Sequence, residues 1–314
     1  MNLKSSYIYN LFLIKLGDQR FWSRCRKVTI GLLLFQLVLF LWIYIPELKE
    51  RWDDIYPLLI KASIVVIILV WIFWGYYRWF DKFTVVHRVV GFISKAVIIL
   101  YLLQWFFLFL FWIINPPITI TQLENVVQGY GLKRDYVSYD QISPNMKLAV
   151  LASEDQLFTD HDGFDVKAIK LALKYNKRHQ KKTHGASTIS QQTAKNVFLW
   201  QGRTMIRKAL EVYFTFMIET FWSKKKILER YLNVIETGPG IFGVQAAARA
   251  DFNKDAKDLT RAEAAMIAAC LPSPKRYTVK PMATHVRARY DDIMVQMNNL
   301  EGDPDIDELI GVHQ

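Results

Sequence analysis

The sequence reads SEDQLFTDHDG at residues 153–163, GASTISQQTAKN at 185–196, RKALE at 207–211 and KKKILERYLN at 224–233. Two carboxylates in these motifs, Glu154 and Glu211, lie 57 positions apart, and no acid occurs between Asp165 and Glu211. Glu154 and its neighbour Asp155 would point about 100° apart on a helix end, so they cannot form a facing pair. The pattern suits a site in which Glu154 deprotonates one group while an anionic leaving group is held nearby.

Capping residues predict that the surrounding chain is helical. Ser143 followed by Pro144 is typical of a helix start, and this helix would deliver Glu154 at its C-terminal end. Asp165 is expected to cap the next helix. Strand signal is weak except at residues 136–138, so the composition of this part favours an all-α fold. Further helix starts are expected at Thr188 with Gln191, at Thr204, at Ser223, and at Thr260 with Glu263.

The chain is basic, and its bases are concentrated between the two carboxylates. The net charge is +11, and eleven Lys or Arg residues lie between Asp165 and Glu211. Residues 174–182 suit a solvated face or anionic headgroups. Four other bases, set among apolar residues, suit a pyrophosphate group; they are Lys195, Arg203, Arg207 and Lys208. Arg207 and Glu211 lie four apart on one helix face, which a surface salt bridge would also explain.

Three apolar runs, at residues 28–45, 63–77 and 89–114, precede this region. A spanning helix needs roughly 20 mostly apolar residues, so the second run suits either a span or an interfacial helix. The flanking charges alternate positive, negative, positive, which predicts a cytoplasmic N-terminus, three spans and an external C-terminal part. We therefore expect an extension with two transmembrane helices (1–88), a third helix with a linker (89–118), and a domain at 119–314.

Other residue patterns exclude several classes of site. The two cysteines, Cys25 and Cys270, provide neither a disulfide framework nor zinc-ligand spacing. Ser187 does not lie in the G-x-S-x-G context of a hydrolase nucleophile. The glycines at 238 and 240 are too few for a nucleotide-binding fingerprint.

Taken together, the four motifs resemble those of the family-51 peptidoglycan glycosyltransferases, in particular the monofunctional biosynthetic type without a transpeptidase domain. The resemblance covers residues from about 115 to 300 and rests on Glu154-Asp155-x-x-Phe158-x-x-His161-x-Gly163 and on the three motifs that follow. It implies a membrane-anchored, lysozyme-like α-helical glycosyltransferase domain on the periplasmic face of a bacterial inner membrane. It also implies lipid II and the nascent glycan strand as substrates, the bilayer and possible wall-synthesis membrane proteins as partners, and no nucleic acid.

The resemblance implies roles for individual residues. Glu154 would be the general base that takes the proton from the acceptor 4-hydroxyl, giving a β-1,4 link, and Glu211 would orient the cations or the donor. No cofactor is expected to be required; a divalent cation (Mg²⁺ or Mn²⁺) at Glu211 is left open, and the sequence shows no dedicated metal site. Substrate-binding roles are implied for Asp155, Phe158, His161, Ser187, Thr188, Gln191, Gln192, Lys195, Asn196, Arg203, Arg207 and Lys208.

Two other functions are compatible with parts of the pattern. A lysozyme-like enzyme that cuts glycan needs one acid in an apolar cleft, but it has no need of the basic helices. A non-catalytic membrane scaffold of wall synthesis would not need Glu154 or Glu211. The apolar residues 197–200 are either core, or they include a membrane-facing lip formed by Phe198 and Trp200.

Overall fold

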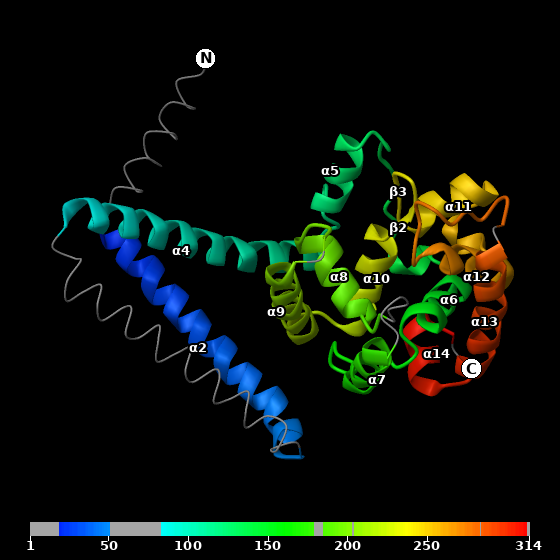
Figure 1. The fold of residues 1–314 in the computed structure, drawn as a ribbon, viewed down its shortest axis with the longest axis horizontal. Helices are drawn as coiled ribbons and strands as arrows, with labels where there is room; N and C mark the ends of the chain where they lie inside the picture. The colour runs from blue at the N-terminus through cyan, green and yellow to red at the C-terminus, as the bar shows by residue number, and fades with distance from the viewer. Residues whose placement is uncertain (1–18, 51–82, 179–184, 203, 283, 313–314) are drawn as a thin grey trace. The chain divides into compact units, whose positions relative to one another are not determined.

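The computed structural model describes residues 19–50, 83–178, 185–202, 204–282 and 284–312 (Figure 1). The chain divides into two compact units, Met1–Phe107 and Leu108–Gln314. The described part of the first contains α2 (Gln19–Glu50) and most of α4 (Thr84–Ile113), whose last residues belong to the second unit. The hydroxyl of Tyr101 on α4 donates to Gln36 Oε1 on α2 at 2.6 Å, so a polar contact joins the two apolar helices.

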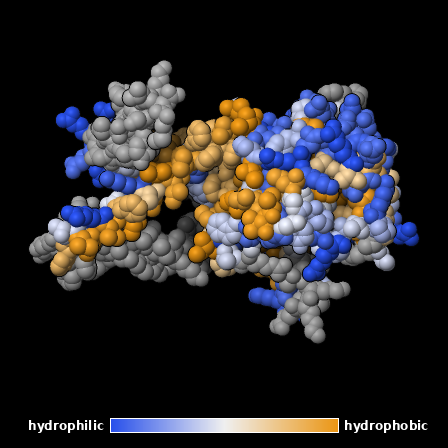
Figure 2. Space-filling model, turned by 90° about the horizontal axis from the view of Figure 1, so that it is seen from above, coloured by the Kyte–Doolittle hydropathy of each residue, from blue (hydrophilic) through white to orange (hydrophobic). Residues whose placement is uncertain are grey.

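Among the described residues, α4 is a helix long and apolar enough to cross a membrane, judged by length and composition. Figure 2 shows hydrophobic side chains dominating the described N-terminal helices and a mixed surface over the C-terminal unit. The first apolar run, 28–45, lies within α2, and the run 63–77 lies outside the described residues. The three-span arrangement and the domain limits at 88 and 118 therefore stay predictions.

The second unit is built from helices, which confirms the all-α expectation (Figure 1). Its helices are α5 (Ile120–Val127), α6 (Pro144–Glu154), α7 (Val166–Arg178), α8 (Ile189–Phe198), α9 (Met205–Phe221), α10 (Lys224–Val234), α11 (Val244–Phe252), α12 (Arg261–Cys270), α13 (Thr284–Leu300) and α14 (Pro304–Ile310). The 3₁₀ turns are η2 (Tyr139–Gln141) and η3 (Ala256–Asp258). In the core, α6 packs against α12 and α13, and α8 packs against α9 and α10.

The predicted helix starts are confirmed. The Ser143 side chain accepts the N–H of Met146 and Pro144 is the first residue of α6, while Asp165 accepts the N–H of Ala168 at 2.8 Å. Capping boxes form as expected at α8 and α12, and single caps at α9 and α10. Because each cap satisfies N–H groups that a helix leaves open, these short polar motifs determine where the helices begin.

The predicted strand at residues 136–138 is wrong. The strands are β1 (Lys133–Arg134), β2 (Glu236–Gly238) and β3 (Ile241–Phe242), in the order β1-β3-β2, with β1 parallel and β2 antiparallel to β3. The backbone of residue 137 is instead hydrogen-bonded to a side chain. Its N–H donates to Asn233 Oδ1 at 2.9 Å and its carbonyl accepts from Asn233 Nδ2 at 3.0 Å, so one side chain replaces a neighbouring strand.

The end of α4 is held by an arginine from the fourth motif. Arg230, on α10, is 1% exposed. It donates to the carbonyls of Phe111 at 2.6 Å and Trp112 at 3.0 Å, and to Asn115 Oδ1 at 2.7 Å. Carbonyls at a helix C-terminus lack partners within the helix, so Arg230 caps α4 just before Asn115 and the two prolines that follow it, which cannot continue a helix.

Candidate active site

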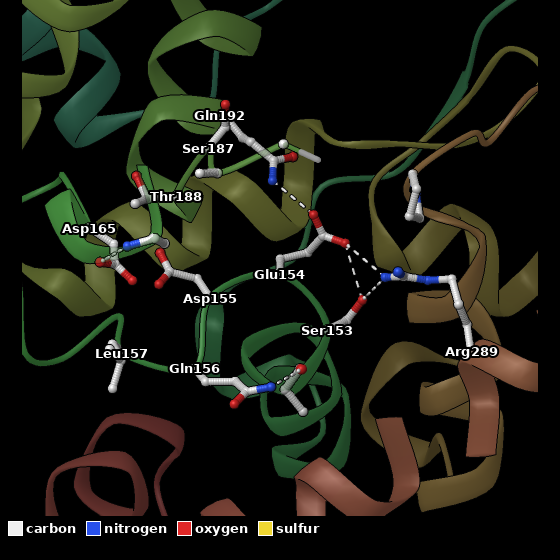
Figure 3. A pocket seen from close by; sticks show the side chains of 15 residues that line it. Ser153, Glu154, Asp155, Gln156, Leu157, Asp165, Ser187, Thr188, Gln192 and Arg289 are labelled. Atoms are coloured by element: carbon white, nitrogen blue, oxygen red, sulfur yellow. Dashed lines mark hydrogen bonds and ion pairs between the residues drawn. The ribbon is translucent and has the colours of Figure 1, made fainter. Parts of the chain in front are cut away.

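Glu154 ends α6 at the wall of a cavity of about 550 Å³ (Figure 3). Its side chain is 13% exposed. Gln192 Nε2, from α8, donates to Glu154 Oε2 at 2.9 Å, and Ser153 Oγ lies 3.1 Å from Glu154 Oε1. An Arg289 nitrogen, from α13, lies 3.7 Å from the same Oε1. The carboxylate therefore has mainly neutral hydrogen-bond donors and one cation beyond hydrogen-bond distance.

Burial raises the pKa of Glu154 above its ordinary value. Hydrogen bonding by Gln192, the charge of Arg289 and hydrogen bonding by Ser153 oppose this rise in pKa, and the negative charge of Asp155 adds to it. A carboxylate whose pKa is raised by loss of solvent is a better proton acceptor than an exposed one. The position, the cavity and this pKa direction fit the expected general base.

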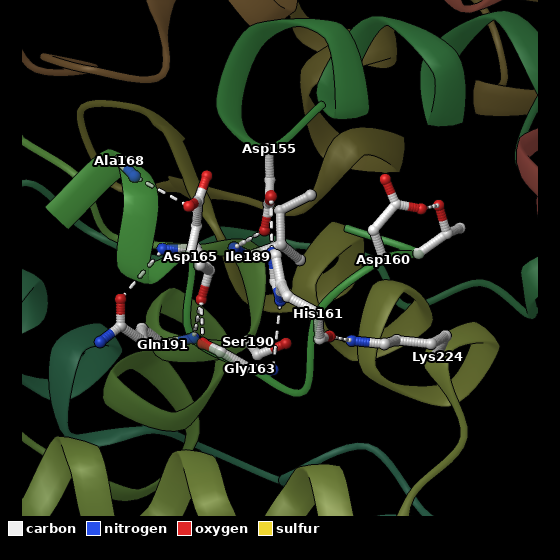
Figure 4. Close-up of polar contacts among 12 residues, drawn as sticks. Asp155, Asp160, His161, Gly163, Asp165, Ala168, Ile189, Ser190, Gln191 and Lys224 are labelled. Atoms are coloured by element: carbon white, nitrogen blue, oxygen red, sulfur yellow. Dashed lines mark hydrogen bonds and ion pairs between the residues drawn. The ribbon is translucent and has the colours of Figure 1, made fainter. Parts of the chain in front are cut away.

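Asp155, directly after α6, contacts Ile189 of α8 and His161 of the following loop (Figure 4). Its Oδ2 accepts the N–H of Ile189, the first residue of α8, at 2.9 Å, and its Oδ1 lies 3.0 Å from His161 Nε2. Because Gly163 N–H donates to His161 Nδ1 at 3.2 Å, the ring hydrogen is on Nε2 and points to Asp155. Asp155 is thus a buried acceptor at the N-terminus of α8, and it holds α8 next to Glu154.

The loop after Asp155 is held by contacts with residues of α9 and α10. Phe158 is 1% exposed, and the Lys224 ammonium lies 4.6 Å from its ring centroid and donates to the His161 carbonyl at 2.5 Å. Gly163 has φ +87°, and a Cβ there would lie 2.8 Å from Glu219 Cγ and 2.8 Å from Thr215 Cγ2. Glycine is required at this position by both the backbone conformation and the close approach of α9.

The motif at 185–196 forms the upper wall of the cavity, where Ser187, Thr188 and Gln192 are among the lining residues. Thr188 caps α8, donates to the Gly163 carbonyl at 2.7 Å and exchanges hydrogen bonds with Gln191. Gln192 faces Glu154, and its Oε1 accepts from Tyr231 at 3.4 Å. Asn196 is 3% exposed and accepts from Gln201 at 3.4 Å.

The second carboxylate lies in a cationic group on α9. Glu211 is 4% exposed and its Oε2 lies 2.6 Å from Arg207 Nη1, while its Oε1 pairs with the ammonium of Lys208. The exposed fractions of the Arg207 and Lys208 side chains are 8% and 43%. The alternative of a surface salt bridge for Arg207 and Glu211 is therefore wrong, because both side chains are buried. Arg203 lies outside the described residues.

Lys195, on α8, connects the two carboxylates electrostatically. Burial lowers its pKa, Glu211 and Glu154 raise it, and Arg207 and Lys208 lower it further. Each of these groups acts on the Lys195 ammonium, so the structure brings Glu154, Lys195 and the α9 cluster into one electrostatic site. A half-buried ammonium near two other cations has lost part of its hydration, so it is suited to bind an anionic ligand.

Sequence reasoning missed Arg289 and the supporting role of Lys224. Arg289 lines the cavity 135 positions after Glu154, and no motif spacing connects them. Among the described residues, no group of three or more His, Cys, Asp or Glu side chains could hold a metal ion.

Comparison with known proteins agrees with this geometry. A family model described as transglycosylase matches residues 121–298. Biosynthetic peptidoglycan transglycosylases of Escherichia coli O139:H28 and Shigella boydii serotype 4 are each 46% identical over 231 residues, which cover 71% of this chain and 96% of each relative. The chain belongs to the transglycosylase family. As a peptidoglycan transglycosylase it is a glycosyltransferase, and the matched region includes every predicted site residue as well as Arg289.

Proposed function

We propose that the enzyme polymerises lipid II, a disaccharide-pentapeptide carried on undecaprenyl pyrophosphate, into β-1,4-linked glycan strands. The observation that carries the proposal is a buried carboxylate in a cavity, Glu154, with the cations Lys195, Arg207 and Lys208 in the same electrostatic site. The reaction needs a proton acceptor for the hydroxyl of the acceptor sugar and cations that stabilise the diphosphate leaving group of the donor.

In the proposed reaction, Glu154 takes the proton of the acceptor 4-hydroxyl as its oxygen attacks the anomeric carbon of the donor glycan. The bond from that carbon to the diphosphate oxygen breaks, and undecaprenyl pyrophosphate leaves with the electron pair, with inversion at carbon. Lys195, Arg207 and Lys208 stabilise the charge that develops on the leaving group. No acid is needed to protonate that group, which fits the cationic surroundings of Glu211.

The test uses the full chain in detergent micelles with labelled lipid II, and in parallel with preformed glycan. Long glycan from lipid II supports the proposal. Shortened preformed glycan would instead show a glycan-cleaving enzyme, and no change in either substrate would show a non-catalytic scaffold. The proposed reaction requires no cofactor, and the same reaction with EDTA, Mg²⁺ or Mn²⁺ measures whether a divalent cation at Glu211 contributes to the rate.

We also propose that the protein is a multi-pass protein of the bacterial inner membrane with a cytoplasmic N-terminus and a periplasmic catalytic domain. The apolar helix α4 and the alternating flanking charges support this orientation. A reporter fused after Gln314 should be active only outside the cytoplasm, and one fused near residue 82 only inside. Cytoplasmic activity of the C-terminal fusion would contradict the orientation.

A further inference from the structure

Arg289 reaches the proposed base from the C-terminal helix α13 (Figure 3). Its Nη2 donates to Ser153 Oγ at 3.0 Å and lies 3.7 Å from Glu154 Oε1. Ser153 Oγ lies 3.1 Å from Glu154 Oε1 and 3.4 Å from the Ala268 carbonyl of α12. The Arg289 side chain is 30% exposed and lines the cavity.

Only one assignment of hydrogen-bond donors and acceptors is consistent with these contacts. A guanidinium can only donate, so Ser153 accepts from Arg289 and has a single hydrogen left to give. The carboxylate oxygen is the nearer acceptor and carries charge, so it is favoured over the Ala268 carbonyl. The chain of donors therefore runs from Arg289 through Ser153 to Glu154 Oε1, while Gln192 donates to Oε2 from the opposite side.

The other charged or titratable groups around Glu154 do not have the role of Arg289. Asp155, its neighbour on α6, has like charge. Lys195 on α8 interacts with Glu154 but also with Glu211, and Tyr231 on α10 is a buried neutral phenol. The charge of Arg289 lowers the pKa of Glu154, and Arg289 also donates to Ser153, which contacts the same carboxylate oxygen.

We propose that Arg289 is a positioning residue, which holds Glu154 through Ser153 in one orientation and in its charged form. The proposal rests on the function proposed above, because Glu154 acts there as the base. Without Arg289, loss of the nearby opposite charge should raise the pKa of Glu154 further. General-base activity falls as pH drops through that pKa, so the acidic limb of the rate profile should move to higher pH by about one pH unit.

The experiment measures kcat/KM for lipid II against pH with the full chain carrying Arg289→Gln, Arg289→Lys or Arg287→Gln. Arg287 is exposed on the same helix and serves as the matched control. We expect kcat/KM of Arg289→Gln to fall about tenfold at pH values on the acidic limb and to recover at high pH. A limb moved by one pH unit corresponds to a tenfold change in the ionised fraction of Glu154 at those pH values. Arg289→Lys should be closer to the wild type, and Arg287→Gln should equal it.

A purely structural role would lower the rate equally at all pH values together with Tm, and that result, or an unshifted profile, would overturn the proposal. If the wild type forms no glycan, the proposed function fails, and thermal unfolding still tests Arg289. Glu154→Gln, Arg289→Gln and the double variant are unfolded across pH beside the wild type. The destabilisation that Glu154 causes as it ionises should extend to higher pH without Arg289; an identical pH dependence with and without Arg289 would again contradict the proposal.

Discussion

The two buried glutamates of the site have opposite surroundings. Glu154 receives hydrogen bonds from the neutral side chains of Gln192 and Ser153, and the nearest guanidinium stays 3.7 Å away. Glu211 is paired directly with Arg207 and Lys208. A carboxylate that already has two cationic partners is a poor proton acceptor, whereas one held by neutral donors in a buried place is a good one.

In the proposed reaction, the same residue type has two tasks that differ because its neighbours differ. Burial without a direct ion pair would let Glu154 accept a proton at a cost in stability, since an ionised carboxylate loses its solvent. Burial with two ion pairs would let Glu211 orient the cations that bind the diphosphate.

The largest effect is expected for Glu154→Gln. The substitution keeps the shape of the side chain but removes the proton acceptor, and loss of a general base costs about 10²–10⁴ in rate. We expect kcat for glycan formation to fall by that factor, measured with labelled lipid II and the full chain. Near-normal polymer yield would remove Glu154 from the role of base.

Glu211→Gln should mainly affect stability. It leaves the buried Arg207 without its partner, which typically costs about 3–5 kcal/mol, and about 2–4 °C of Tm per kcal/mol is usual at this size. We expect Tm to fall by roughly 6 °C or more on that scale. The matched control is Glu301→Gln, because Glu301 is 63% exposed and pairs with Arg261 at 3.2 Å; its Tm should hardly change. Equal Tm for both variants would mean that the Glu211 pair is no stronger than a surface pair.

Glu154→Gln should change Tm in the opposite direction. The pKa of Glu154 is raised in the folded protein, so the native state holds its proton more tightly than the unfolded state. Stability contributed by that proton is present below the ordinary pKa of a glutamate and is lost as pH rises through the raised folded value. At neutral pH we expect Glu154→Gln to raise Tm, and acidification should remove the difference. A variant that melts lower than the wild type at every pH would contradict this assignment.

The smallest effect concerns the apolar residues after α8. Val197 and Leu199 are buried, whereas Phe198 and Trp200 are half-buried, and Phe198 stacks on Phe214 at 4.7 Å between ring centroids. If Phe198 and Trp200 face the bilayer interface, changing both to Ser in the full chain should weaken the contact between the C-terminal unit and lipid. The same change should alter Tm little. Because the chain has ten tryptophans, quenching of Trp200 by lipid-borne quenchers in vesicles is measured as the difference between the wild type and Trp200→Phe.

Leu199→Ser is the core control for this last comparison and should lower Tm strongly, because Leu199 is 2% exposed. A large Tm loss in the Phe198 and Trp200 variant, with no quenching of Trp200 in the wild type, would show that these residues are core. Met205 and Ile206, which are 85% and 73% exposed, are then the next candidates for contact with lipid.

Sequence patterns predicted the helices well because their information is local. Ser143 with Pro144, and Thr188 with Gln191, act within one helical turn, so the start of α6 and of α8 could be read directly. The spacing of Arg207 and Glu211 likewise gave the correct helix face, although only the fold shows that both are buried.

Long-range contacts could not be predicted in this way. The side chain of Asn233, 96 positions away, pairs with the backbone of residue 137 in place of a neighbouring strand, so the strand predicted at 136–138 does not form. Asp155 contacts Ile189 and His161, which lie 34 and 6 positions away, and Arg289 reaches Glu154 from α13. Each of these contacts depends on how α6, α8, α10 and α13 pack, which no local pattern encodes.

Binding of labelled lipid II to the full chain tests the division of tasks between the two parts of the site most directly. Glu154→Gln and Lys195→Gln are compared with the wild type under conditions without turnover. We expect Glu154→Gln to bind as the wild type does. Lys195→Gln should bind about 10–100-fold more weakly, the usual worth of one hydrogen bond to a charged group. Weakened binding by Glu154→Gln with unchanged binding by Lys195→Gln would contradict the separation of proton acceptor and diphosphate site.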